Sequence, residues 1–312
     1  DAGAGAKPSL DVNDILALVP EYALSLDINV VNVCQKPSGS LDLADMLNLA
    51  EEIDRQVAAG VEGIVVIQGT DTLEETAFAI DLMTACEVPV VFTGAMRHAS
   101  MLSADGAGNL ANALIIAQSE LARSRGVLVT FDDEIHKASL VVKQSTFRTA
   151  AFASNMMASA GFMIESTPTF TAPARASHEP RILRPKTPAP VAIINAALGE
   201  EPVLLAALPD LAYQGVVLEG CGGGHVAANW MPVVRTITAQ MPLVLATRVV
   251  NGPVLRRTYG YEGSEIDLVS SGAIPSGLLS AHKARVLLSL ALGEGLSAAD
   301  IASLLAQYDV GV

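Results

Sequence analysis

Short apolar runs alternate with amphipathic patterns over much of the first half of the chain. From about residue 10 to 131, apolar runs of strand length are separated by segments with helical spacing. Strands are predicted over residues 26–33, 63–68, 88–93 and 127–131, and helices over 41–57, 72–84 and 109–121. Apolar strands separated by helices are typical of a parallel sheet that is covered on both faces and joined by right-handed crossovers. The pattern therefore predicts an α/β domain.

Several predicted helices have recognisable start signals. Thr72 followed by Glu75 is a capping-box pattern, in which side chain and backbone satisfy each other's hydrogen bonds at the helix start. Ser280 and Ser297 precede two later helices and are predicted to be their N-caps.

The alternation is interrupted once, near the middle of the chain. Residues 167–189 contain five prolines and no apolar period, which is typical of a linker. Beyond them, strands are predicted over 191–195, 215–219 and 243–247, and helices over about 225–240, 280–292 and 297–308. We therefore predict a larger N-terminal α/β domain over 1–173, a linker over 174–189, and a smaller C-terminal α/β domain over 190–312.

Polar residues follow three of the predicted N-terminal strands. Ser38 and Ser40 follow the first, residues 69–72 (GTDT) follow the second, and residues 94–97 (GAMR) follow the third. Ligands of open parallel sheets bind at the carboxyl ends of the strands, so these segments are candidates for one site. The alternative is structural, since strand-to-helix turns commonly use such residues as caps and loops.

Two further features are ambiguous from the pattern alone. Lys143 lies in an otherwise apolar stretch, where it is either an edge residue whose amine reaches solvent or a desolvated base. Residues 220–225 (GCGGGH) form a glycine-rich turn after a strand. His225 occupies the place of the last glycine of a dinucleotide motif, so that interpretation fails. The sequence also contains no phosphate-binding P-loop and no GxSxG motif.

Charge, apolar content and histidine spacing disfavour several classes of function. The chain has 19 basic and 33 acidic residues, a net charge of −14, which disfavours binding to nucleic acid. Apolar residues make up 51% of the chain, yet no apolar run reaches the ~18 residues that a membrane span needs. The five histidines are scattered without a metal-binding spacing. We therefore predict neither a membrane span nor a metal or other cofactor.

The order of several motifs resembles the bacterial L-asparaginase/glutaminase family. These motifs are QGTDTLEETA at 68–77, PVVFTGAMR at 89–97, SADG at 103–106 with Asn109, RGVLV at 125–129, Lys143, and KARVLL at 283–288. The resemblance covers nearly the whole chain in order. It implies a larger N-terminal and a smaller C-terminal α/β domain, hydrolysis of a side-chain amide to acid and ammonia, and a homodimer or homotetramer.

The resemblance also assigns catalytic roles by position. Thr70 matches the family's second catalytic threonine, grouped with Asp71 and Lys143. A lysine desolvated by apolar neighbours can be neutral and take the threonine proton.

Substrate-binding roles are implied in the same way. Gly69, Thr70 and Asp71 match the family's substrate-binding turn, in which Asp71 resembles the residue that holds the α-amino group. Ser38, with Ser40 as a rival, matches the serine that binds the α-carboxylate. Ala95 and Met96 match the residues that line the amide end of the substrate in the family. Glu265 matches a residue that reaches the substrate in trans, from a neighbouring subunit.

The family's primary threonine lies in a TGGTI-like loop at the end of its first strand. The sequence starts at Asp1, at a point where that loop should already have passed, so we expect the strand and loop to precede residue 1. The leading hypothesis is hydrolysis of L-asparagine, with some L-glutamine activity, by a cytoplasmic enzyme; the periplasm is the alternative compartment. The other hypotheses are an ammonia-producing subunit of a tRNA-dependent amidotransferase and a catalytically inactive homologue that binds an amino acid.

Overall fold

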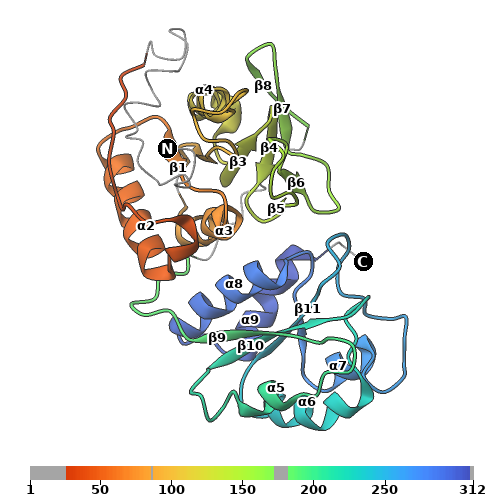
Figure 1. Cartoon of the computed structure of the whole chain (residues 1–312). Coiled ribbons are helices and arrows are strands. Elements are labelled where there is room, and N and C mark those ends of the chain that lie inside the picture. Colours follow the sequence, from red (N-terminus) through yellow and green to blue (C-terminus); the bar gives the residue numbers. More distant parts are fainter. Residues whose placement is uncertain (1–25, 86, 172–181, 310–312) are drawn as a thin grey trace. The chain divides into compact units, whose positions relative to one another are not determined.

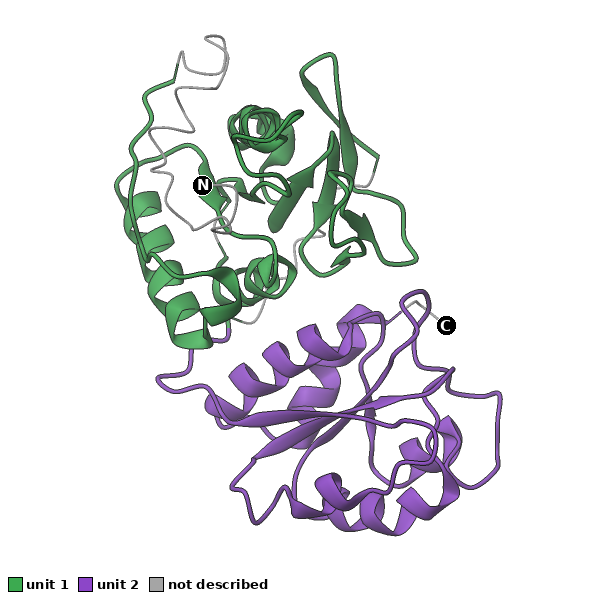
Figure 2. Ribbon diagram, viewed as in Figure 1, with its two compact units in different colours: residues 1–182 green, residues 183–312 purple. Residues whose placement is uncertain are grey.

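The computed structural model describes residues 26–85, 87–171 and 182–309, which divide into two compact units at Ile182 and Leu183 (Figures 1 and 2). This division lies within the predicted linker, whose residues 174–181 are outside the described residues. Each unit has its own sheet, so the two-domain α/β architecture predicted from the sequence is confirmed.

Unit 1 is built on a six-stranded mixed sheet in the order β1-β2-β3-β4-β7-β8. The apolar strands β1 (Ile64–Ile67), β2 (Val90–Thr93) and β3 (Val127–Phe131) pair in parallel. The helices that connect these strands are α3 (Leu73–Met83) and α4 (Gly106–Ala117), which lie on opposite sides of the sheet, and α2 (Leu43–Ala58) packs beside α3 (Figure 1). The parallel part therefore arises where the sequence alternates between apolar runs and helical patterns.

The rest of the unit 1 sheet is antiparallel. It consists of β4 (Glu134–Lys137), β7 (Gly161–Ile164) and β8 (Thr167–Phe170). A separate antiparallel pair, β5 (Val141–Lys143) and β6 (Phe152–Ser154), carries Lys143 at the end of β5. These strands have only three or four residues each, too few to show a clear period. Because Thr167–Phe170 form β8, the first residues of the proline-rich segment belong to the sheet.

One predicted strand is absent from the described part of unit 1. Residues 26–33 pair with no described strand, and Val30, Val31 and Val33 remain exposed. Only Leu26 and Ile28 pack inward, against a small apolar cluster on α4. The prediction is wrong for the described chain because a β-strand needs a hydrogen-bonded neighbour as well as an apolar sequence.

Unit 2 contains a four-stranded parallel sheet in the order β12-β11-β10-β9. Its strands are β9 (Val191–Asn195), β10 (Gly215–Gly220), β11 (Leu243–Thr247) and β12 (Ile274–Pro275). Helices α8 (Ala281–Gly293) and α9 (Ala298–Leu305) cover one face. The other face carries α5 (Val203–Ala207), α6 (Met231–Thr238) and α7 (Glu265–Ser270), as Figure 1 shows.

The two serines predicted to be N-caps both lie at helix starts in unit 2. The hydroxyls of Ser280 and Ser297 accept hydrogen bonds from the backbone N–H groups of Lys283 and Asp300, so both predicted N-caps are confirmed. The helix predicted from residue 225 begins only at Met231, because Cys221 and His225 form a tight antiparallel bridge in the preceding turn. Within the described residues, no helix has both the length and the apolar character needed to cross a bilayer.

Candidate active site

Two neighbouring parallel strands of unit 1 end beside each other and provide the candidate site. The turn after β1 leads through residues 68–72 into α3, and the loop after β2 contains Gly94, Ala95 and Met96. The two segments approach closely, since a Cβ on Gly94 would lie 2.2 Å from the backbone oxygen of Gln68. Glycine at position 94 is therefore required for the close approach.

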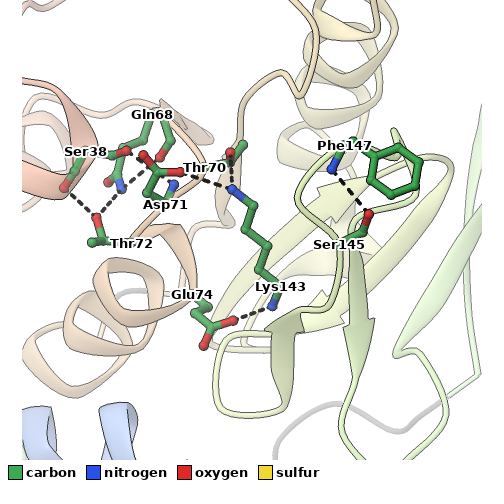
Figure 3. A network of polar contacts seen from close by, with 10 residues as sticks. Ser38, Gln68, Thr70, Asp71, Thr72, Glu74, Lys143, Ser145 and Phe147 are labelled. Atoms are coloured by element: carbon green, nitrogen blue, oxygen red, sulfur yellow. Dashed lines mark hydrogen bonds and ion pairs between the residues drawn. The ribbon is translucent and has the colours of Figure 1, made fainter.

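Lys143 joins the turn after β1 from a different element. Its Nζ donates to Thr70 Oγ1 at 2.8 Å and to Asp71 Oδ1 at 3.2 Å (Figure 3). The lysine side chain is only 19% exposed, whereas that of Asp71 is 73% exposed. The structure thus brings the three predicted catalytic residues into one cluster, with one carboxylate oriented toward solvent and accessible to a cationic group.

Glu74 holds the strand that carries this lysine, a role that the sequence analysis missed. Its carboxylate accepts a hydrogen bond from the backbone N–H of Lys143 (Figure 3). Because β5 belongs to a two-stranded sheet separate from the main one, this contact ties it directly to the first turn of α3. The acidic pair in the LEET sequence was the available signal, but it does not show which carboxylate faces β5.

Ser38, rather than Ser40, lies in the site. The Ser38 hydroxyl accepts a hydrogen bond from the backbone N–H of Asp71 at 3.2 Å, and its side chain is buried, whereas Ser40 is exposed. A Cβ on Gly69 would lie 2.8 Å from Ser38 Oγ. Glycine at position 69 therefore leaves the space in which this hydroxyl sits.

Thr72 does not cap its helix in the predicted way. It occupies the N-cap position of α3, but its side chain makes no capping hydrogen bond. Its hydroxyl donates to the backbone oxygen of Ser38 at 2.8 Å and contacts the Gln68 amide at 3.3 Å (Figure 3). The capping-box prediction is wrong because the chain around Ser38 competes successfully for this hydroxyl.

Asp105 organises the loop that contains Ala95 and Met96. Its carboxylate accepts hydrogen bonds from the backbone N–H groups of Met96 and Arg97, each at 2.9 Å. The Asn109 amide donates to Asp105 at 3.0 Å and to the backbone oxygen of Gly94 at 3.0 Å. The loop is thus fixed from the start of α4, although the sequence analysis gave Asp105 no role beyond its place in a motif.

Glu265 lies in unit 2 with partners of its own. Its side chain is fully buried and accepts hydrogen bonds from the backbone N–H groups of Thr258 and Tyr259, both at 2.8 Å, while His225 Nε2 lies 3.0 Å away. Burial acts to raise the pKa of the Glu265 carboxyl, but the hydrogen bonds outweigh it and the pKa is lowered. The predicted contact with a neighbouring subunit stays a prediction. Within its own unit, both carboxylate oxygens of Glu265 already have hydrogen-bond partners.

No candidate metal centre is found within residues 26–85, 87–171 and 182–309. No three histidine, cysteine, aspartate or glutamate side chains gather there closely enough to hold an ion.

Comparison with protein families gives two matches that together cover most of the chain. Residues 1–175 match the family described as "Asparaginase, N-terminal", and residues 190–305 match the "Glutaminase/Asparaginase C-terminal domain".

Individual relatives agree with these matches. A "Probable L-asparaginase" of Deinococcus radiodurans is 39% identical over 85% of this chain and 81% of its own length. A glutamyl-tRNA(Gln) amidotransferase component from Methanosarcina barkeri is 33% identical over 84% of this chain, but over only 63% of its own length. The crystal structure of a probable cytoplasmic L-asparaginase from Campylobacter jejuni superposes with a TM-score of 0.86 at 29% identity, covering 96% of this chain and 94% of that one.

Proposed function

The chain belongs to the asparaginase family, and we propose that it hydrolyses the side-chain amide of L-asparagine to L-aspartate and ammonia. The observation that carries the proposal is the contact between Lys143 Nζ and Thr70 Oγ1 at 2.8 Å. A hydroxyl and an amine at this distance can exchange a proton directly, which is the geometry that general acid–base catalysis requires.

The catalytic step uses this pair. With its amine unprotonated, Lys143 accepts the proton of the Thr70 hydroxyl, and Thr70 in turn takes the proton of the oxygen nucleophile as that oxygen forms a bond to the amide carbon. The proton then passes to the departing nitrogen, which leaves as ammonia, and water releases L-aspartate from the acylated oxygen.

The two charged ends of the amino acid have matching groups nearby. The exposed carboxylate of Asp71 is available to pair with an α-ammonium group, and the Ser38 hydroxyl lies next to the Asp71 backbone, where it can donate to an α-carboxylate. The loop of Ala95 and Met96, held by Asp105, supplies backbone groups for the amide end.

The oligomeric state is part of the proposal. We propose a homodimer or homotetramer in which a carboxylate from the C-terminal loop reaches the substrate of a neighbouring subunit. Glu265 would have to leave its internal hydrogen bonds for this role. Glu262, in the same loop, lies 3.9 Å from Arg235 and its side chain is 56% exposed. Because it is exposed, Glu262 is the alternative residue for the contact with the neighbouring subunit's substrate. The name of the Campylobacter protein supports a cytoplasmic location.

An amidotransferase component is the second candidate, favoured by the Methanosarcina relative. The net charge of −14 disfavours the tRNA-compatible surface that such a complex uses.

Product analysis tests the proposal against both alternatives. The purified full-length protein is incubated with L-asparagine or L-glutamine, and ammonia and the amino-acid product are measured. We expect one aspartate for each ammonia, with L-asparagine preferred. An enzyme that releases ammonia only from L-glutamine, or a protein that binds L-asparagine without releasing ammonia, contradicts the proposal.

A further inference from the structure

The strand β9 lies at the edge of the unit 2 sheet, and no described strand pairs with its outer side. The backbone oxygen of Pro190 and the backbone N–H of Ala196, one at each end of β9, are hydrogen-bonded toward β10 at 2.9 Å each. Alternate residues of a strand direct their backbone groups to opposite sides, so the even-numbered positions face β10. The N–H and C=O groups that face the open edge are therefore those of Val191, Ile193 and Asn195.

This edge lacks the features that usually protect an exposed strand. Native edges are shielded by charged side chains, prolines or bulges, because their unpaired backbone groups can pair with another chain. Val191–Ile194 carry only apolar side chains. They also line an open groove of about 440 Å³ together with Leu204, Leu208, Leu211 and Tyr213. Since Leu204 and Leu211 are 61% and 63% exposed, the edge and its groove form one apolar surface that is suited to being covered.

Opposite charges lie at the two ends of β9, on one face of the sheet. The even-numbered side chains of the strand pack against the core on the α6 side, so the odd-numbered ones face α8. At the start of the strand, Nε of Arg285 in α8 donates to the backbone oxygen of Val191 at 3.1 Å. At its end, the Asn195 amide donates to the Glu219 carboxylate at 2.6 Å. The strand thus has a cation at one end and an anion at the other.

We propose that β9 pairs in antiparallel orientation with β9 of a second copy of the chain, about a two-fold axis at Ile193. In this register Ile193 meets its own copy, and Val191 meets Asn195 in both directions. Each of these pairs exchanges both of its N–H and C=O groups, as directly opposed residues of an antiparallel ladder do. A register centred on either neighbouring residue would pair only two of the three outward-facing residues.

The same register brings the opposite charges together. A two-fold axis perpendicular to the sheet keeps each face on its own side, so Arg285 of one copy lies toward Glu219 of the other. The contact occurs twice, because the interface is formed by the same surface of both copies. On the other face the two grooves adjoin, so that Leu204 and Leu211 are removed from water. The backbone groups, the charges and the apolar surface are thus all self-complementary about one axis.

This surface is distinct from the loop over residues 259–265, which the proposed function places at a neighbouring subunit's substrate. Two different two-fold contacts on one chain join pairs of copies into a closed tetramer. Breaking the β9 contact should then leave dimers, or single chains if the loop makes no contact. In either case the mass of the assembly is halved, so this test is independent of the proposed amide hydrolysis.

Sedimentation of the full-length protein tests the backbone pairing. Ile193→Pro removes an N–H that faces the open edge and leaves the hydrogen bonds to β10 in place, which edge strands tolerate. We expect this variant to sediment at half the mass of the unsubstituted protein.

Exchange of the two charges tests the register. In Arg285→Glu and in Glu219→Arg, like charges face each other at both symmetric positions, so we expect the dissociation constant of the contact to rise by about tenfold or more. The variant with both substitutions restores opposite charges and should recover most of the association. Glu62→Arg is the control, since it makes the same change of charge at an exposed position of unit 1 and should leave the association unchanged.

An unsubstituted protein that sediments as a single chain overturns the inference, and the edge is then free for another partner such as an extended peptide. It is also overturned if the folded single charge variants associate as strongly as the unsubstituted protein, or if the double exchange associates no better than they do. If Ile193→Pro fails to fold by circular dichroism, the charge exchange decides alone.

Discussion

The clusters around Lys143 in unit 1 and around His225 in unit 2 share a plan but differ in where the charge lies. Each joins a carboxylate, a nitrogen base and a hydroxyl by hydrogen bonds. In unit 1 the carboxylate, Asp71, is 73% exposed, whereas in unit 2 the carboxylate, Glu265, is fully buried. An exposed carboxylate is available to a substrate, and a buried one orients its neighbour and stabilises the fold. The position of the carboxylate therefore distinguishes a cluster whose negative charge is open to solvent from one whose negative charge is enclosed by the protein.

The largest expected effect comes from removing the hydroxyl of the first cluster. Thr70→Val keeps the shape of the side chain but removes the group that contacts Lys143 Nζ. We expect asparagine hydrolysis to fall by about 10²–10⁴-fold, with a small change in thermal stability, as for loss of a proton-transfer group. Steady-state kinetics and thermal unfolding measure both quantities. A variant that retains most of its activity would remove Thr70 from the mechanism.

Glu74 should act through the position of Lys143. In Glu74→Ala, the backbone N–H of Lys143 loses its acceptor and β5 loses its tie to α3, so we expect kcat to fall by up to about 10²-fold, as a misplacement near 1 Å can cause. Glu74→Gln keeps an acceptor oxygen and should recover most of the loss. Equal kcat values for the two variants would show that the charge of Glu74, rather than its hydrogen bond, is important.

The comparison of the two carboxylates is also a prediction about stability. Glu265→Gln should lower the free energy of unfolding by about 1–3 kcal/mol, because a buried charged acceptor is lost. The matched substitution Asp71→Asn, at an exposed position, should change it by less than about 0.5 kcal/mol. Chemical denaturation followed by circular dichroism gives both values.

The pH dependence of the free energy of unfolding shows whether ionised Glu265 stabilises or destabilises the folded protein. Its pKa is lowered from 4.5 on folding, so its ionised form stabilises the folded state. That contribution is complete above pH 4.5 and is lost as the pH falls below 4.5 through the folded pKa. The stability difference between the unsubstituted protein and Glu265→Gln should therefore shrink under acid conditions. A difference that grows on acidification would contradict the lowered pKa.

Gly69 should show the smallest of these effects. A Cβ there would lie 2.8 Å from Ser38 Oγ, so in Gly69→Ala the serine hydroxyl has to shift. We expect a rise in KM of about tenfold, since one well-placed hydrogen bond to a charged group is weakened. Gly39→Ala is the control, because a Cβ at that position meets no atom within 4 Å.

The sequence predicted the elements with a long, repeated pattern and the residues that sit in them. Thr70 and Asp71 could be located because an apolar strand followed by a helix start defines the end of a parallel strand. The strands over 141–170 were missed because each is too short to show a period. For residues 26–33 the apolar pattern was present but a paired strand was not, among the described residues.

The parts of the site that could not be predicted depend on contacts between distant backbone and side-chain atoms. Glu74 meets the N–H of Lys143 across 69 residues, and nothing in the local sequence distinguishes it from Glu75. The Thr72 hydroxyl is taken by the backbone of Ser38, 34 residues earlier, in place of its own helix. Glu265 was assigned a substrate contact from its motif position, but its burial depends on how the loop at Thr258 folds back over it.

The most direct test of the account is the turnover of L-asparagine by Lys143→Met, compared with Lys137→Met. Both lysines end short strands of unit 1, but in the structure only Lys143 contacts Thr70. We predict that Lys143→Met loses about 10²–10⁴-fold in kcat while Lys137→Met keeps the activity of the unsubstituted protein. Near-normal turnover by folded Lys143→Met would contradict the central claim that this amine moves the proton in amide hydrolysis.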